Sequence, residues 1–288
     1  GNRAHYSAVG GVENSIRSLL KVVADRQDQA VLVCREPILN EALDKSAIAL
    51  PQEIELVMYV DEYRQNFLRR ILYLRQGGKS LSQIYGRLFT EYPDSPVIAR
   101  NHMHVLAAAT AGFKNIRYLV PSLTVNQLRE DLVGASILDR LKTIAHMLID
   151  GWLQDGAFRA AELFVFSESM QRQVRQRLPK AAKGKNITMV LPGIDSARFK
   201  PVNSHDKIKL RRRLGLPIKQ NLFLFVGRFA QSKGLSYLLE ALVTMPLDCT
   251  LVLVGEGERE SSIRETVSAL GLNERVLFHI ATSVPEDY

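Results

Sequence analysis

The feature that most constrains the fold is an alternation of short apolar runs with longer amphipathic stretches along almost the whole chain. The short runs are typical of buried strands, and the stretches between them place apolar residues at helical spacing. Strands that alternate with helices pair in parallel, so the pattern predicts an α/β protein. The expected strands are Ala30–Cys34, Ile54–Val60, Pro96–Ala99, Ile116–Val120, Leu163–Phe166, Ile187–Leu191 and residues 222–227, 250–254 and 275–279.

A break in the alternation divides the chain into two expected domains. Pro192-Gly193-Ile194-Asp195 ends the first series of strands, and the basic run Lys207–Arg213 precedes the second. We place an N-terminal domain at residues 1–192 and a C-terminal domain at residues 193–288. The second series holds three strands and two helices, which is small beside the ~100–150 residues common for domains. We therefore expect the second domain to be incomplete. Residues 1–9 lack the apolar run of a first strand, so we expect the first domain to be incomplete as well.

The composition excludes several classes of protein. The chain has 288 residues, 46% of them hydrophobic and 24% charged, and its longest apolar runs are far too short to cross a bilayer. Because it has no zinc-finger spacing and no aromatic RNA-binding motif, nucleic acid is not an expected partner. Cys34 and Cys249 border predicted strands, which favours buried reduced thiols and a cytoplasmic location.

Residues 62–90 form a basic amphipathic stretch in a chain whose net charge is +8. Arginines at positions 64, 69, 70, 75 and 87 alternate there with aromatic and aliphatic residues. Such a helix could lie on an anionic membrane surface. It could equally be a surface helix whose arginine stems cover apolar neighbours, and both interpretations stay open.

One strand-to-helix turn carries two cations. Gly227 and Arg228 follow strand 222–227, and Lys233 precedes a helix that starts near Leu235. In an open parallel sheet such a turn lies at the carboxyl edge, where ligands bind. Fixed cations beside a helix N-terminus suit a diphosphate. The alternative is a solvated loop with two ordinary surface cations.

Two further turns are rich in glycine. Gly10-Gly11 precedes a helix and would let the backbone approach a phosphate closely, because neither residue has a Cβ. Gly255-Glu256-Gly257 follows the next strand of the second domain, where a nucleoside would lie beside a diphosphate. The same glycines begin a dinucleotide-binding pattern, but Glu260 replaces its third glycine, so a nicotinamide-dependent oxidoreductase is not favoured. No residues have metal-ligand spacing, and we expect neither a metal nor a cofactor.

Together these segments resemble the GT-B glycosyltransferases of family 4 (glycosyltransferase group 1) over nearly the whole chain. The matching residues are Gly10–Glu13, Val165–Ser169, Leu191–Asp195, Phe199, Pro201, Val226–Arg228, Lys233–Leu235 and Leu253–Gly257. The resemblance implies two Rossmann-like, doubly wound domains facing each other across a cleft, the second one incomplete. It also implies transfer of a sugar from a UDP- or GDP-sugar to a glycan or lipid-linked acceptor, with retained configuration, in polysaccharide or lipopolysaccharide biosynthesis.

The resemblance also gives the candidate residues their roles. Arg228 and Lys233 would hold the donor diphosphate and stabilise the leaving group, which is electrostatic catalysis. The residues expected around the donor are Gly10, Gly11, Gly227, Arg228, Lys233, Gly255 and Glu256.

Three residues are expected on the acceptor side, namely Glu13, His102 and His104. His102 is also a candidate for catalysis, because a histidine in the cleft could hydrogen-bond a sugar hydroxyl and exchange a proton. Each of the three has a structural alternative. Glu13 could be only a helix-dipole partner, and the histidines could be structural residues at the end of a strand.

The sequence departs from the family in two places. The family carries two glutamates, eight positions apart, that contact the donor, and the chain ends before them. Pro121-Ser122 stand where many relatives have an active-site histidine. Two functions therefore stay open: a glycosyltransferase at the cytoplasmic face of a membrane, and a non-catalytic protein that keeps the fold for binding or scaffolding. A GT-B epimerase or phosphorylase is less favoured, because we find neither the cofactor-lysine site nor the phosphate pocket that a phosphorylase would need.

Overall fold

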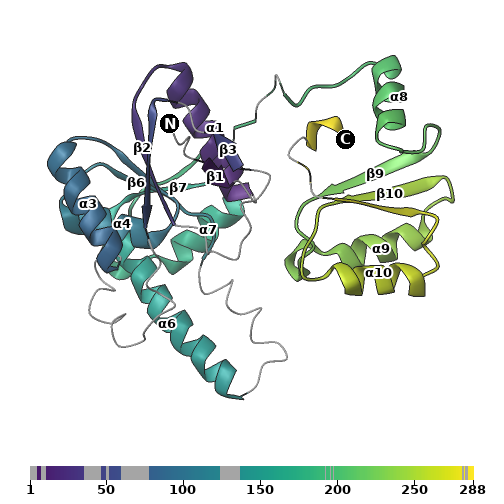
Figure 1. Ribbon diagram of the computed structural model, residues 1–288. Coiled ribbons are helices and arrows are strands. Elements are labelled where there is room, and N and C mark those ends of the chain that lie inside the picture. Colours follow the sequence, from purple (N-terminus) through teal and green to yellow (C-terminus); the bar gives the residue numbers. More distant parts are fainter. Residues whose placement is uncertain are drawn as a thin grey trace. The chain divides into compact units, whose positions relative to one another are not determined.

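The computed structural model describes residues 5–7, 11–35, 47–49, 52–59, 78–123, 137–191, 193–194, 196, 198–280, 282 and 285–288. It divides the chain into two compact units, one built on residues 15–193 and the other on residues 194–288, with the first 14 residues divided between them. Each unit contains parallel strands covered by helices (Figure 1). The structure thus confirms the α/β fold.

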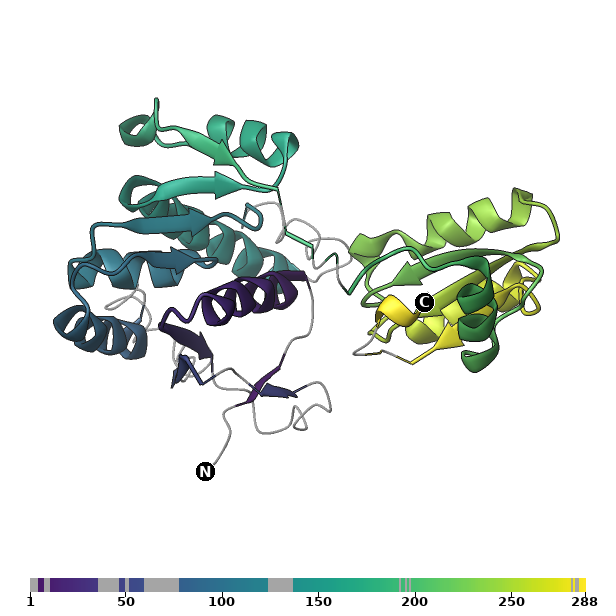
Figure 2. The same cartoon turned by 90° about the horizontal axis from the view of Figure 1, so that it is seen from above.

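The first unit is built on a four-stranded parallel sheet in the order β5-β6-β7-β8, whose strands lie side by side in Figure 2. They are β5 (Val97–Ala99), β6 (Ile116–Leu119), β7 (Glu162–Val165) and β8 (Ile187–Met189). Two further pairs are β2 (Ala30–Arg35) with β4 (Ile54–Tyr59), and β1 (His5–Ser7) with β3 (Ala47–Ala49). The helices are α1 (Gly11–Asp25), α3 (Lys79–Glu91), α4 (His102–Ala111), α6 (Ile137–Ala160), α7 (Glu168–Arg177) and the 3-10 helix η3 (Lys180–Ala182).

Small residues and helix caps explain the packing of this unit. α4 contacts both α3 and α6, and its residues Ala107 and Ala108 are fully buried, since alanine lets neighbouring helices approach closely. Asn101 caps α4 by accepting a hydrogen bond from the Met103 N–H at 2.8 Å. Ser167 caps α7 by accepting one from the Met170 N–H at 3.2 Å.

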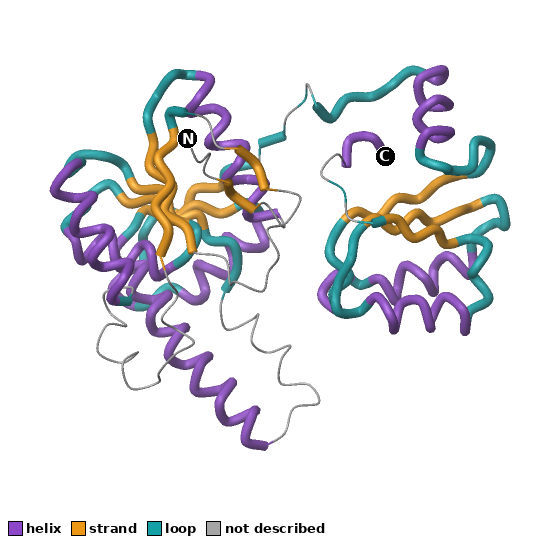
Figure 3. The backbone as a smooth tube through the Cα atoms, viewed as in Figure 1, coloured by secondary structure: helices purple, strands orange, loops and turns teal. Residues whose placement is uncertain are grey.

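The second unit contains a three-stranded parallel sheet in the order β11-β10-β9. Its strands are β9 (Asn221–Val226), β10 (Cys249–Val254) and β11 (Val276–His279). Helices α9 (Leu235–Thr244) and α10 (Glu260–Ala269) cover one face of this sheet, and α8 (Ser204–Arg213) lies on the other (Figure 3). Two 3-10 helices, η4 (Gln231–Lys233) and η5 (Pro285–Asp287), complete the elements described in this unit.

The central strand β10 is buried along its whole length. Leu251 and Leu253 pack with residues of α9 and α10, whereas Val252 and Val254 pack with Leu216 on the opposite face. An uninterrupted apolar run of this kind is what a strand covered on both faces requires.

The structure differs from the sequence interpretation at two elements. β1 is a strand at His5–Ser7 although no apolar run marks it, because it pairs with the equally short β3 and not with a larger sheet. His102 and His104 lie in the first turn of α4 and not at a strand end, because Asn101 starts the helix directly before His102.

Other expectations fall partly or wholly outside the described residues. The basic stretch 62–90 is described only from residue 78 onward, where α3 begins at Lys79. The long helix expected over residues 126–160 is described from Ile137. The predicted free cysteines are present, Cys34 half-buried and Cys249 buried.

Candidate functional site

The three strands of the second unit end level with one another. Val254 of β10 is paired with Val226 of β9 on one side and with His279 of β11 on the other. The turns that begin at Gly227, Gly255 and Ile280 therefore meet at one edge of the sheet. This is the carboxyl edge, where open parallel sheets bind their ligands.

The turn after β9 is anchored by Phe229. Its side chain is 1% exposed, and its ring lies 6.1 Å from the Phe225 ring and 6.3 Å from the Phe278 ring, centroid to centroid. Arg228, directly before it, is exposed, and so is Lys233 at the end of η4. Burial of one aromatic ring thus fixes a turn that presents two cations to solvent.

Arg228 and Lys233 differ from the arginines around them. Within the described residues neither side chain makes a hydrogen bond or an ion pair. By contrast, Arg259 donates to Ser262 and Gln231, and Arg264 donates to Glu260. The two cations are therefore available to an external anion.

Helix α9 adds to the positive potential of this turn. It begins after Gly234, which has left-handed dihedrals (φ 66°, ψ 27°) and offers no side chain to cap the first N–H groups. The positive end of a helix dipole with free N–H groups favours an anion, as the neighbouring cations do. The turn from Gly227 to Leu235 can therefore bind a phosphate-like group.

The glycines after β10 have a structural explanation of their own. A Cβ on Gly257 would lie 2.5 Å from the oxygen and 2.7 Å from the nitrogen of Phe229, and a Cβ on Gly255 would overlap the carbonyl oxygen of Gly227. The two turns are also hydrogen-bonded, from the Phe229 N–H to the Glu256 carbonyl (2.9 Å) and from the Arg259 N–H to the Phe229 carbonyl (3.1 Å). Both glycines are needed for turn-to-turn packing, whether or not a ligand lies beside them.

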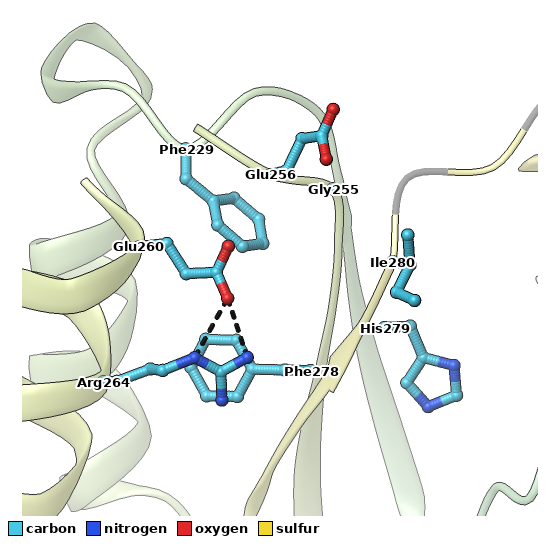
Figure 4. Close-up of a pocket in the computed structure, with 8 residues that line it drawn as sticks. All are labelled: Phe229, Gly255, Glu256, Glu260, Arg264, Phe278, His279 and Ile280. Carbon is cyan, nitrogen blue, oxygen red and sulfur yellow. Dashed lines mark hydrogen bonds and ion pairs between the residues drawn. The ribbon is translucent and has the colours of Figure 1, made fainter. Parts of the chain in front are cut away.

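A small pocket of about 100 Å³ opens beside these turns (Figure 4). Its lining residues are Phe229, Gly255, Glu256, Glu260, Arg264, Phe278, His279 and Ile280. Arg264 donates to one oxygen of Glu260 at 2.8 and 3.0 Å, and its guanidinium lies 3.9 Å from the centroid of the Phe278 ring. The pocket is smaller than the ~300–1,000 Å³ typical of ligand sites.

Sequence reasoning missed the pocket wall formed by Glu260, Arg264 and Phe278. The four-residue spacing of Glu260 and Arg264 in a predicted helix is a signal for their ion pair. The contact with Phe278 depends on the packing of α10 against β11 and has no signal in the local sequence.

The candidate histidines lie in the first unit. His104 is held between two tyrosines, with Nδ1 3.0 Å from the Tyr85 hydroxyl and Nε2 3.3 Å from the Tyr59 hydroxyl. A neutral imidazole donates through one nitrogen and accepts through the other, so both are engaged. This arrangement favours the structural explanation for His104.

Burial keeps both histidines uncharged. It lowers the pKa of His102 to about 4 and that of His104 to about 4, where proximity to His102 also contributes. At neutral pH a neutral His102 could still accept or donate a hydrogen bond, but it is not a source of positive charge.

The remaining candidates are described only in part. Gly11 is the first residue of α1, whereas Gly10 and the side chain of Glu13 lie outside the described residues. Within the part of the chain that the structure describes, no group of three or more His, Cys, Asp or Glu side chains could hold a metal ion.

Comparison with known sequences finds a family match within the second unit. Residues 206–288 match the family model of Glycosyl transferases group 1. A Bacillus subtilis protein named for a role in teichuronic acid biosynthesis, glycosyltransferase TuaC, is 34% identical over 113 residues, which are 38% of this chain and 29% of that protein. A D-inositol 3-phosphate glycosyltransferase of Xylanimonas cellulosilytica is 37% identical over 100 residues, 32% of this chain and 24% of that protein. The matches thus span less than a third of these curated relatives.

Comparison with solved structures covers both units. WaaG, a glycosyltransferase involved in lipopolysaccharide biosynthesis, matches with a TM-score of 0.67 and 18% identity over 98% of this chain and 70% of that one. Anabaena Alr3699/HepE in complex with UDP-glucose matches with a TM-score of 0.65 and 18% identity over 98% of this chain and 68% of that one. At this level of identity the likeness shows the fold, which is that of GT-B glycosyltransferases.

Proposed function

We propose that the chain belongs to a retaining GT-B glycosyltransferase of family 4, which moves a sugar from a UDP- or GDP-sugar to a glycan or lipid-linked acceptor in polysaccharide or lipopolysaccharide biosynthesis. The observation that carries the proposal is the pair Arg228 and Lys233. Both are exposed at the carboxyl edge of the β9–β11 sheet, and neither side chain makes a hydrogen bond or an ion pair within the described residues. They lie in the segment that matches the group 1 family model.

The proposed role of these residues follows from their chemistry. The planar guanidinium of Arg228 can donate two parallel hydrogen bonds to phosphate oxygens, and Lys233 supplies a point charge. Negative charge grows on the diphosphate as its bond to the sugar breaks. Cations that the fold already holds in place stabilise that charge without reorganisation at the moment of reaction.

The choice of donor is narrowed by one structural neighbour. HepE was crystallised with UDP-glucose, which makes UDP-glucose the first donor to test on this chain. GDP- and ADP-sugars are the controls for the base.

The acceptor and the membrane are assigned to the first unit. We assign acceptor binding to the side that carries His102, and peripheral contact with the inner face of a membrane to the basic stretch 62–90. None of the described helices is both long and apolar enough to cross a bilayer. Reversal of Arg64, Arg69 and Arg70 to glutamate should weaken vesicle binding if the stretch makes that contact.

The decisive experiment compares Arg228→Ala with Arg212→Ala, which removes another exposed arginine, from α8. We expect UDP or UDP-glucose to raise the thermal unfolding temperature of the wild type and of Arg212→Ala, but not of Arg228→Ala. If Arg228 stabilises negative charge in the transition state, its loss should lower kcat/KM by a factor that corresponds to ~2–4 kcal/mol of transition-state stabilisation. A response to every nucleotide that is unchanged in Arg228→Ala would refute the assignment. Tight binding without sugar transfer would instead favour a non-catalytic binding protein.

A further inference from the structure

The second unit has a strongly uneven charge distribution that its net charge hides. Residues 194–288 contain 13 Lys and Arg against 11 Asp and Glu, so the unit is almost neutral. Residues 198–219 alone contain eight Lys and Arg against a single acidic residue, Asp206. The rest of the unit therefore carries five basic residues against ten acidic ones, and the positive charge is concentrated around α8.

Two of these basic residues make contacts within the second unit that stabilise its fold. Arg211 donates to the carbonyl oxygens of Pro217, Ile218 and Gln220 at 2.9–3.1 Å, which fixes the loop after α8. Arg213 is 2.7 Å from a carboxylate oxygen of Asp287, although 59% of its side chain stays exposed.

The other cations of α8 face solvent. Lys207 and Arg212 are exposed and make no side-chain hydrogen bond or ion pair within the described residues. Lys209 is 63% exposed, and among the described residues its side chain pairs with Asp206 alone, at 4.0 Å. A surface ion pair of this length contributes little to protein stability. The side chains of Lys207, Lys209 and Arg212 can therefore turn toward an external partner.

Apolar side chains are exposed next to these cations. Ile208, between Lys207 and Lys209, is 36% exposed, and Ile218 is 43% exposed. The hydrogen bond from Arg211 to the Ile218 carbonyl places Ile218 beside α8. The same surface therefore offers positive charge and isolated aliphatic groups.

We propose that α8 and the loop after it form a docking surface for an anionic lipid layer. Clusters of four to eight Lys and Arg bind anionic headgroups, and aliphatic side chains beside them can enter the headgroup region. Nucleic acid is a poorer fit, because α8 has no aromatic residue on which a base could stack. The surface lies on the face of the β9–β11 sheet opposite α9 and α10 (Figure 3), and it is separate in sequence from the stretch 62–90.

The test is co-sedimentation of the full chain with vesicles. One set contains equal parts of phosphatidylglycerol and phosphatidylcholine, and the other contains phosphatidylcholine alone. The variant Lys207→Glu/Lys209→Glu/Arg212→Glu is compared with Lys114→Glu/Lys180→Glu/Lys183→Glu. This control reverses three exposed lysines of the first unit and changes the net charge equally. An alanine triple at positions 207, 209 and 212 removes the charge without reversing it.

We expect the wild type and the control to bind the vesicles that contain phosphatidylglycerol and not those of phosphatidylcholine alone. The alanine triple in α8 should weaken this binding by roughly 100-fold, since each of the three cations that it removes contributes about a factor of five near an anionic surface. The glutamate triple should weaken binding further, because its carboxylates are also repelled by the anionic headgroups. Binding should fall with added salt, because screening weakens interactions of exposed charges.

Three results would overturn the proposal. An equal loss of vesicle binding in the α8 glutamate variant and in its control would mean that binding depends on net charge and not on α8. Unchanged binding in both α8 variants would place any membrane contact elsewhere in the chain. Equally tight binding of soluble heparin or RNA would mean that the surface accepts any polyanion. The UDP-induced thermal shift is measured on the same variants and should stay unchanged, so failure here is distinguishable from failure of the donor site.

Discussion

Substitution of Gly257 by alanine tests how the site is assembled. The added Cβ would lie 2.5, 2.7 and 2.9 Å from three backbone atoms of Phe229, and contacts under 3.0 Å are essentially never observed. Because backbone atoms cannot rotate away as a side-chain tip can, one turn must move relative to the other. Overpacking of this kind costs ~1–3 kcal/mol. Loss of the two hydrogen bonds between the turns adds about 0.5–1.5 kcal/mol each. We expect Gly257→Ala to destabilise the second unit by ~2–6 kcal/mol.

Gly193→Ala is the matched control, because no atom lies within 4 Å of its added Cβ. Its effect should stay within about 0.5 kcal/mol. The assay is urea unfolding followed by circular dichroism, which reports on both units, and by the fluorescence of Trp152. This is the single tryptophan, and it lies on α6 in the first unit. The Gly257 variant should shift the dichroism transition more than the fluorescence transition. A loss of stability no larger than that of Gly193→Ala would refute the explanation by turn packing.

Two further predictions concern the first unit. Gly86 lies inside α3 with open space around its Cβ position, so Gly86→Ala should stabilise the protein by about 0.5–1 kcal/mol through helix propensity; a decrease in the urea midpoint would contradict this. The pKa values of His102 and His104 are lowered from 6.5 to about 4, so the unfolded chain binds these protons first on acidification. The contribution of these two neutral histidines to the free energy of unfolding should therefore be fully present above pH 6.5. It should fall by up to ~3 kcal/mol per histidine as the pH approaches 4. Urea titrations of the wild type and His104→Gln check this, and equal pH slopes for the two proteins would disprove it.

Structural features that depend on neighbouring residues could be predicted from the sequence. Apolar runs predicted β9 and β10, because the apolar pattern of a strand depends on residues a few positions apart. β10 is buried along its length as expected, whereas Phe223, Leu224 and Val226 of β9 are exposed. The exposed positions of Arg228 and Lys233 at the end of β9 also follow from the order of strand, turn and helix.

Features that depend on distant residues could not be predicted. His104 meets Tyr85 and Tyr59, which are 19 and 45 positions away, and only the packing of α4 against α3 and β4 brings the three rings together. Gly257 must be a glycine because of Phe229, 28 positions earlier. The pattern Gly255-x-Gly257 suggested an approach to a ligand, whereas the structure gives contact between two turns as a sufficient cause.

The hydrogen bonds between these two turns affect the entropy of ligand binding. A cation on a free loop must be ordered when its anion arrives, and that ordering reduces affinity by ~0.5–1.5 kcal/mol for each immobilised side chain, with a further loss for the loop backbone. Here the backbone on both sides of Phe229 is already fixed by the Glu256 carbonyl and the Arg259 N–H, and the Phe229 ring is buried. The backbone of Arg228 is thus ordered during folding. An anion that binds there needs to immobilise only the arginine side chain.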